Sequence, residues 1–247
     1  MHSYGPLCTL FYDADKPVVA DGEVAWYAQS LPKDAGPLLE LMCGSGRLLV
    51  PLVADGWKLH GVDASAAMLA SCEARLAERK LTSPLFRQDL TLLNLPFRYS
   101  AAFVAAGSFQ LITDPGAAAL ALQRIRAHLV DPGLLLMDMF VPSESSQRLG
   151  APLVELERVA LGDGTHITLR TESTMWAEAR MWRIASRYSH RRGATLLGEE
   201  NEVLSLTWYS PAEISALLAE AGFRDVAEGT SPRASDDSMH FAVTART

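Results

Sequence analysis

The stretch between Pro37 and Asp63 constrains the fold of this chain more than any other. A short apolar run, "PLLELM", is broken by Gly44-Ser45-Gly46; a segment of helical length follows, and "WKLHGVD" then has the length of a second strand. This is the pattern of a strand–turn–helix–strand unit. The glycines let the backbone of the turn approach a ligand, and the N-terminus of the helix faces the same point. Asp63 is expected at the carboxyl end of the second strand, within reach of that ligand.

Short apolar runs and helical patterns continue to alternate as far as Phe140. Five strands separated by helices predict a doubly wound, mostly parallel α/β sheet of the Rossmann-like kind. Ser210, followed three residues later by Glu213, has the spacing of a capping box and predicts the start of another helix. The runs "FRDVAE" and "MHFAVTA" after it are expected to complete a seven-stranded sheet.

The pattern changes between Leu153 and Trp208, where apolar residues recur with a period of two. Asp163-Gly164 is a strong hairpin signal inside this region. The sequence therefore predicts an antiparallel β meander inserted into the α/β fold, with Trp182, Tyr188 and His190 on the same face of one strand.

The composition limits the partners and the compartment. A 49% hydrophobic and 21% charged chain can build a core, while a net charge of −7 argues against binding to nucleic acid or to an anionic membrane. No apolar run approaches membrane-spanning length, and the N-terminal residues lack the pattern of a signal peptide. The three cysteines have neither metal-like nor paired spacing. These features predict a cytoplasmic protein without a metal site.

The glycine turn favours a nucleoside ligand without a pyrophosphate. The dinucleotide fingerprint G-x-G-x-x-G/A ends on a small residue, and Leu49 stands there instead. An NAD-type oxidoreductase is therefore a disfavoured alternative, and a non-catalytic nucleoside-binding module on the same fold is a second one. With the favoured nucleoside ligand, Asp63 would accept hydrogen bonds from the ribose hydroxyls.

Several spaced motifs resemble those of class I S-adenosylmethionine-dependent methyltransferases of the bacterial small-molecule type. "LLELMCGSGR" resembles the first motif, "GVDAS" the second, "RQDL" the third and "DPGLLLMDMF" the fifth-strand motif; "YSPAEISALLAEAGF" matches a common helix. Met42 departs from the family, which usually has Gly or Ala there. The resemblance implies S-adenosyl-L-methionine as cofactor, S-adenosyl-L-homocysteine as product, and no metal. The expected cofactor contacts are Tyr12, Glu40, Gly44, Gly46, Asp63, Ala64, Met68, Asp89, Leu90 and Gly107.

The change of pattern and the resemblance together divide the chain, all within one domain. Residues 1–36 are expected to form an N-terminal lid, 37–152 and 209–247 the cofactor-binding core, and 153–208 an insertion that caps the acceptor pocket or forms a homodimer contact. Aromatic residues of the lid would close over the sulfonium in a cation–π contact.

The predicted reaction is direct in-line transfer of the methyl group to an N or O atom of a small molecule. A sulfonium methyl is already activated, so the protein mainly aligns the acceptor and excludes water. The DNA-amine methyltransferase motif Asn/Asp-Pro-Pro-Tyr/Phe is missing after the fourth strand, where "AAGSF" stands. A general base would serve only a hydroxyl acceptor, with His166 and His190 as candidates. The expected acceptor contacts are Tyr4, Ser108, Trp182 and Tyr188.

Overall fold

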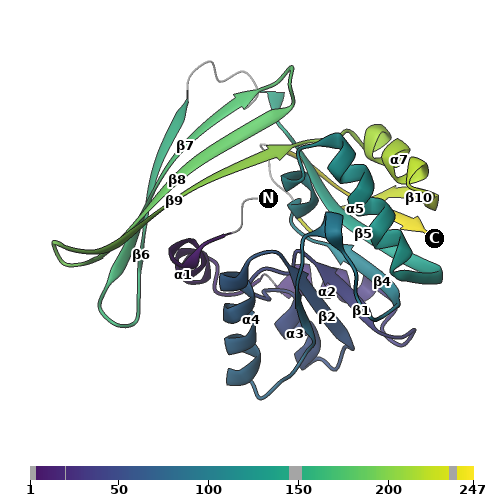
Figure 1. Cartoon of the computed structure of the whole chain (residues 1–247), viewed down its shortest axis with the longest axis horizontal. Helices are drawn as coiled ribbons and strands as arrows, with labels where there is room; N and C mark the ends of the chain where they lie inside the picture. The colour runs from purple at the N-terminus through teal and green to yellow at the C-terminus, as the bar shows by residue number, and fades with distance from the viewer. Residues whose placement is uncertain (1–3, 20, 145–151, 234–237) are drawn as a thin grey trace.

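A computed structural model describes residues 4–19, 21–144, 152–233 and 238–247 (Figure 1). Its larger sheet has the strand order β10-β11-β5-β4-β1-β2-β3. β1 pairs in parallel with β2 and β4, whereas β11 runs antiparallel to both of its neighbours. The predicted seven-stranded, mostly parallel sheet is confirmed. In chain order the strands are β1 (Leu38–Leu41), β2 (Leu59–Asp63), β3 (Leu85–Arg87), β4 (Tyr99–Val104), β5 (Leu129–Pro142), β10 (Arg224–Gly229) and β11 (Ser238–Arg246).

Helices cover both faces of this sheet. Since neighbouring residues of a strand point to opposite sides, each central strand contributes side chains to two cores. On β1, Leu39 and Leu41 pack into a core with α5 and α7, while Leu38 packs into a second core with α2, α3 and α4. Both cores are largely aliphatic. The helices are α1 (Pro6–Asp15), α2 (Asp21–Ser30), α3 (Leu49–Ala54), α4 (Ala66–Glu78), α5 (Pro115–Ala127) and α7 (Pro211–Glu220), and the two 3₁₀ turns are η1 (Leu90–Leu92) and η2 (Ser108–Leu111).

The capping box predicted at the start of α7 is present. The hydroxyl of Ser210 accepts from the backbone N–H of Glu213, and the Glu213 carboxylate accepts in turn from the Ser210 backbone N–H at 2.8 Å. These reciprocal bonds satisfy donors that a helix start otherwise leaves unpaired.

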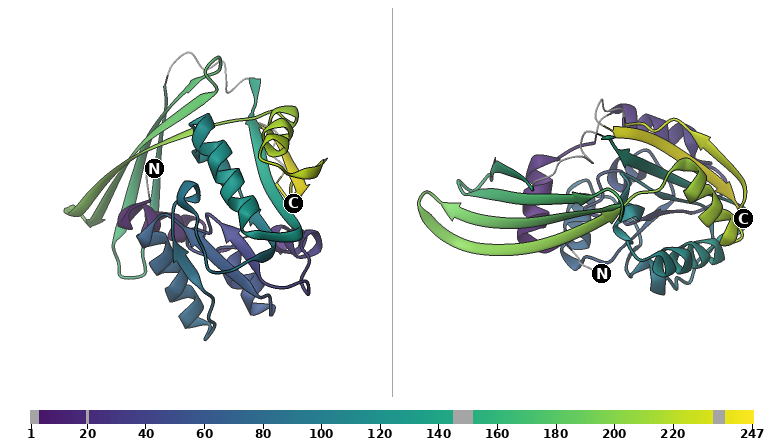
Figure 2. Two further views of the ribbon diagram at one scale, coloured as in Figure 1. Left: turned by 45° about the vertical axis from the view of Figure 1, so that its right-hand side comes forward. Right: turned by 90° about the horizontal axis from the view of Figure 1, so that it is seen from above.

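The inserted region forms a separate four-stranded antiparallel sheet, the meander, whose strands follow one another in sequence order. Figures 1 and 2 show it extending away from the α/β core, with α1 lying against it. The side chains of Cys8 and Phe11 on α1 pack with Ile167, Leu169 and Tyr188 of the meander in a small core of their own. The predicted meander is therefore confirmed. Its strands are β6 (Leu153–Ala160), β7 (His166–Trp176), β8 (Met181–Arg192) and β9 (Thr195–Thr207).

One buried side chain holds the base of the meander against the core. The amide nitrogen of Gln110 donates to the carbonyl oxygens of Phe140 and Thr207, at 3.0 and 2.9 Å, and its amide oxygen accepts from the Phe140 N–H at 2.9 Å. Phe140 lies near the end of β5, where the chain leaves the core, and Thr207 ends β9, where it returns. Gln110, in η2, thus joins the two segments that connect the meander to the core.

Candidate active site

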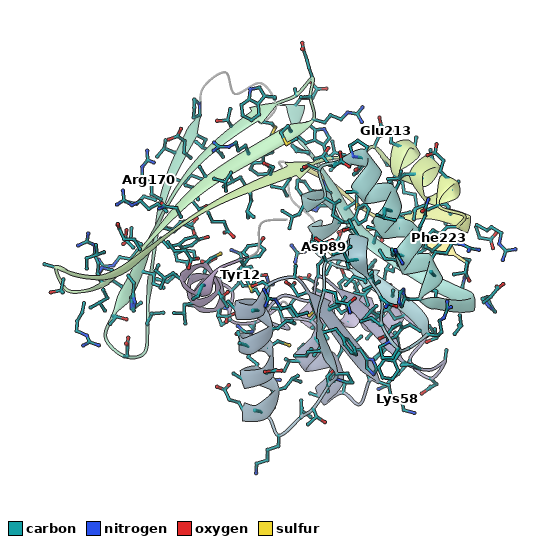
Figure 3. All side chains as sticks on the ribbon, viewed as in Figure 1. Tyr12, Lys58, Asp89, Arg170, Glu213 and Phe223 are labelled. Carbon is teal, nitrogen blue, oxygen red and sulfur yellow. The ribbon has the colours of Figure 1, made fainter. Side chains whose placement is uncertain are left out.

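A cavity of about 320 Å³ lies at the carboxyl edge of the parallel strands, between α1 and β9. This is the edge at which α/β sheets bind ligands. The loops after β1, β2, β3 and β4 form its floor, and the meander contributes Leu204 and Ser205. Figure 3 labels two lining residues, Tyr12 on α1 and Asp89 after β3.

The turn after β1 has the left-handed backbone that the glycines predict, with φ of 54° at Gly44 and 77° at Gly46. A Cβ atom on Gly46 would lie 2.5 Å from the sulfur of Cys72, so this glycine lets the turn pack closely on α4. Met42 also has a positive φ, 55°, which disfavours any residue with a side chain. The Gly or Ala that is usual at this position would carry less strain or less bulk.

Asp63 joins the turn after β1 to the loop after β2. Its two carboxylate oxygens accept hydrogen bonds from the backbone N–H groups of Gly44, at 2.9 Å, and Ser65, at 2.8 Å. Burial raises the pKa of Asp63, and the backbone hydrogen bonds act against that rise. Since a carboxylate has about four acceptor positions, Asp63 retains acceptor capacity for a ligand in the cavity.

Asp89 is held in place by the start of η1. One of its carboxylate oxygens accepts from both the backbone N–H and the hydroxyl of Thr91, at 2.8 and 2.7 Å. The neighbouring Leu90 is 2% exposed and gives this part of the cavity an apolar wall. A flat ring with a hydrogen-bond donor on its edge fits this pair of residues.

Two oppositely charged side chains beneath the turn have unused hydrogen-bonding atoms. Among the described residues, Oε2 of Glu40 and Nε of Arg47 are buried without a hydrogen-bond partner. Burial, followed by the nearby Asp63 and Glu23, raises the pKa of Glu40 well above its usual range, and Arg47 acts in the opposite direction. Buried charged groups of this kind need partners. A ligand carrying both an ammonium and a carboxylate group would satisfy both.

An ionic network of Glu23, Arg233 and Asp138 also borders the cavity, and no motif in the sequence indicates it. Arg233 donates to Glu23 at 2.8 Å and lies 3.6 Å from Asp138, which also accepts from the hydroxyl of Ser231 and the N–H of Ala106. Glu23 and Arg233 line the cavity. No local spacing reveals a pair 210 residues apart, whereas Arg47, directly after the glycine turn, could have been found from its position.

Within the described ranges, no three His, Cys, Asp or Glu side chains are arranged to hold a metal ion. None of the helices there has the length and apolar character needed to cross a membrane.

Solved structures of methyltransferases share this fold. One is an S-adenosylmethionine-dependent methyltransferase from Clostridium acetobutylicum (16% identity, TM-score 0.75, 96% of each chain covered). A second is the sugar N-methyltransferase KedS8 from Streptoalloteichus (23% identity, TM-score 0.74, covering 96% of this chain and 91% of that one). A third is CalS10 from Micromonospora echinaspora, an amino pentose methyltransferase with S-adenosylmethionine bound (21% identity, TM-score 0.69, covering 100% and 99%).

The sequence comparisons find a likeness to methyltransferases in part of the chain. Residues 38–133, from β1 into β5, match the family model described as a methyltransferase domain. This match covers less than half of the 247-residue chain, and within it the chain is similar to a methyltransferase domain. A curated protein of Geobacillus sp. (strain WCH70), named as a methyltransferase, is 29% identical over 102 residues; the match spans 41% of this chain and 41% of that relative's length. The predicted resemblance to methyltransferases is thereby confirmed.

Most of the predicted site residues come together at the cavity. Gly107, with φ of 67°, does not line it: a Cβ there would lie 2.6 Å from the ring of Phe140. Gly46 is likewise a packing residue of the turn. The predicted residues that line the cavity are Tyr4, Tyr12, Glu40, Gly44, Asp63, Ala64, Met68, Asp89, Leu90 and Ser108.

The two aromatic residues predicted from the meander do not line the cavity. The ring of Tyr188 is 6% exposed and contacts that of Phe11 on α1, with centroids 5.8 Å apart. Trp182 contacts Phe140 at the base of the meander. The meander lines the cavity through Leu204 and Ser205 instead. The prediction that the meander caps the cavity is therefore supported by these two residues and not by Trp182 and Tyr188. A dimer contact through the meander stays a prediction.

The two histidines named as bases lie at the far end of the meander. The ring of His190 bonds to the hydroxyl of Thr165 at 2.7 Å, and His166 is opposite Arg191. His190 pairs with Gly198, six residues before Leu204, which at about 3.3 Å per residue is roughly 20 Å along β9. A base there is too far away to reach an acceptor in the cavity.

The buried Glu40 carboxylate predicts an unusual pH dependence. A folded-state pKa above the unfolded value contributes stability below about pH 4.3 that is lost as the pH rises. Glu40→Gln is therefore expected to raise the melting temperature of the ligand-free protein at pH 7.5, with a gain that shrinks toward pH 5. Calorimetric scans across this range test it, with the exposed Glu78→Gln as control. A lower melting temperature at pH 7.5 would contradict it.

Proposed function

We propose that this protein transfers the methyl group of S-adenosyl-L-methionine to an amine nitrogen of a small molecule. The observation that carries the proposal is the order of polar groups along the cavity: Glu40 and Arg47 under the turn, Asp63 after β2, and Asp89 after β3. The cofactor presents an ammonium and a carboxylate, then ribose hydroxyls, then an adenine amino group, in the same order.

Each residue has a defined part in binding. Glu40 accepts from the ammonium group and Arg47 donates to the carboxylate, which satisfies the two atoms that lack partners. Asp63 accepts from the ribose hydroxyls, and Asp89 accepts from the adenine amino group, with Leu90 against the ring. When bound, the cofactor supplies a methyl group that its sulfonium has already activated. Tyr4 and Tyr12 border the cavity and keep water away from it.

An amine is favoured over a hydroxyl for two reasons. Besides Glu40, whose pKa is raised, three carboxylates (Glu23, Asp63, Asp89) and two guanidinium groups (Arg47, Arg233) line the cavity, and this excess of negative charge attracts cations. A hydroxyl acceptor needs a base. On the acceptor side, burial raises the pKa of Tyr4, which keeps its proton, and Glu23 is paired with Arg233. The ammonium form of the acceptor releases its proton to solvent as it enters the cavity. The free amine then attacks the methyl carbon with its lone pair, and the sulfur of the cofactor keeps the electron pair of the broken C–S bond.

The acceptor is expected to be a small polar molecule such as an amino sugar. Ser108 and Leu111 of η2 and Leu204 and Ser205 of β9 also line the cavity, and they offer a mixture of hydroxyl and apolar groups. Sugars present such alternating surfaces. KedS8 and CalS10, which share the fold, are named for sugar and amino pentose substrates.

The test is methyl transfer from tritiated cofactor to matched pairs of amines and hydroxyl analogues: amino sugars, amino acids and aliphatic amines. We expect tritium to be incorporated into the amine of at least one pair and not into its hydroxyl analogue. Preferential labelling of hydroxyl compounds would contradict the choice of nitrogen. Titrations with S-adenosylhomocysteine and NAD accompany the screen. Binding of NAD alone would favour the oxidoreductase, and binding of S-adenosylhomocysteine without transfer to any compound would favour the non-catalytic module.

A further inference from the structure

Helix α1 takes the cap of its N-terminus from the meander. Its N-cap residue is Gly5, which has no side chain to accept from the first backbone N–H groups. The carboxylate of Glu200, on β9, accepts instead from the N–H groups of Leu7, at 3.0 Å, and Cys8, at 3.1 Å. These are the two donors, at the second and third helical positions, that an N-cap side chain usually satisfies. A carboxylate there also interacts favourably with the helix dipole.

The glycine at position 5 is explained by this same contact. Its φ of −85° and ψ of −178° are extended backbone that any residue adopts. A Cβ atom on Gly5 would, however, lie 2.5 Å from the carboxyl carbon of Glu200, and its three nearest atoms all belong to that carboxyl group. Gly5 and Glu200 therefore form a matched pair: the absent side chain leaves the space that the carboxylate occupies.

The capped helix borders the cavity on its other side. Tyr4 directly precedes α1 and Tyr12 lies within it, and both line the cavity. Arg47 donates to the Tyr12 hydroxyl at 2.9 Å, and the Ser65 hydroxyl donates to the Tyr4 carbonyl oxygen at 2.6 Å. Since the N–H of Ser65 donates to Asp63, α1 connects the meander to the loops that hold the proposed ribose contact.

We propose that Glu200 is a positioning residue for the cofactor site. From the meander it caps α1 and so determines where Tyr4 and Tyr12 stand beside the cavity, although Glu200 itself does not line it. The inference rests on the proposed function, because it takes the ligand of the cavity to be the cofactor or its product.

The first test is the Kd for S-adenosylhomocysteine, measured by calorimetry on the whole protein. Losing the cap is expected to raise the Kd about fivefold or more in Glu200→Ala. Glu200→Gln should give a smaller rise, because an amide has one acceptor oxygen for the two N–H groups. The matched control is Glu199→Gln, since this exposed neighbour bonds to Arg187 and Ser189 and not to α1. The control is expected to stay within about twofold of wild type.

The second test separates capping of α1 from a general effect on folding. Gly5→Asp, added to Glu200→Ala, supplies a local N-cap in the space that the carboxylate vacates, and should return the Kd to within about twofold of wild type. In the wild-type background the same substitution sets Asp against Glu200 and should weaken binding. If Glu200→Ala fails to fold, Glu200→Gln and the double variant carry the comparison.

Two results would overturn the inference while leaving the proposed function intact. One is that Glu200→Gln and Glu200→Ala both bind S-adenosylhomocysteine with the affinity of the wild-type protein. The other is that Glu200→Ala lowers the affinity and Gly5→Asp does not restore it. Glu200 would then affect binding through the structure of the meander and not through the cap of α1. A wild-type protein that does not bind S-adenosylhomocysteine would overturn the proposed function and this inference together.

Discussion

Asp63→Ala is expected to raise the Kd for S-adenosylhomocysteine by roughly a hundredfold to ten-thousandfold. In the proposed complex the carboxylate accepts from two ribose hydroxyls, and each hydrogen bond to a charged group contributes about 1.5–3 kcal/mol. With about 1.4 kcal/mol for each factor of ten, two such bonds give this range. The substitution also removes the acceptor of the Gly44 and Ser65 N–H groups, so the two loops lose the side chain that joins them.

Isothermal titration of the folded variant measures this effect. Asp63→Asn retains one acceptor oxygen and is expected to bind with intermediate affinity. Asp55→Ala, an exposed substitution at the end of α3, serves as the control and should bind as wild type does. An Asp63→Ala variant that is folded and binds with wild-type affinity would remove Asp63 from the ribose site.

Gln110→Leu is expected to lower the free energy of unfolding by roughly 3 kcal/mol or more. The side chain is 0% exposed, and its loss leaves three backbone groups without their partners: the N–H and the carbonyl of Phe140 and the carbonyl of Thr207. A buried polar group left unsatisfied costs about 1–3 kcal/mol. Leucine has a similar size, so the effect reports the hydrogen bonds more than a cavity.

Urea unfolding followed by circular dichroism measures the difference, with the exposed Gln123→Leu on α5 as the matched control. Because Gln110 joins the meander to the core, methyl transfer should suffer more than binding of S-adenosylhomocysteine, whose proposed contacts lie on the loops after β1, β2 and β3. A loss below about 1 kcal/mol would mean that water or a shifted backbone replaces the amide.

The sequence by itself determined the features that depend on neighbouring residues. Glycine spacing placed the turn after β1, and alternation of strands and helices brought Asp63 and Asp89 to one edge, because parallel strands end on the same side of a sheet. A period of two showed that Tyr188 and Trp182 share a face of β8. Periodicity identifies such a face but not the element that covers it. Only the tertiary structure showed that α1 packs on Tyr188 and that the cavity is lined by Leu204 and Ser205.

Contacts between residues far apart in the sequence could not be predicted for the same reason. Glu23 and Arg233, Gln110 and Thr207, and Cys8 and Glu200 meet across 97 to 210 residues, and no local pattern marks either partner of such a pair. The imidazole groups of His166 and His190 make them candidate bases by chemistry, but their distance from the cavity depends on which end of the meander is attached to the core. That attachment is set by tertiary hydrogen bonds, which form only once the chain has folded.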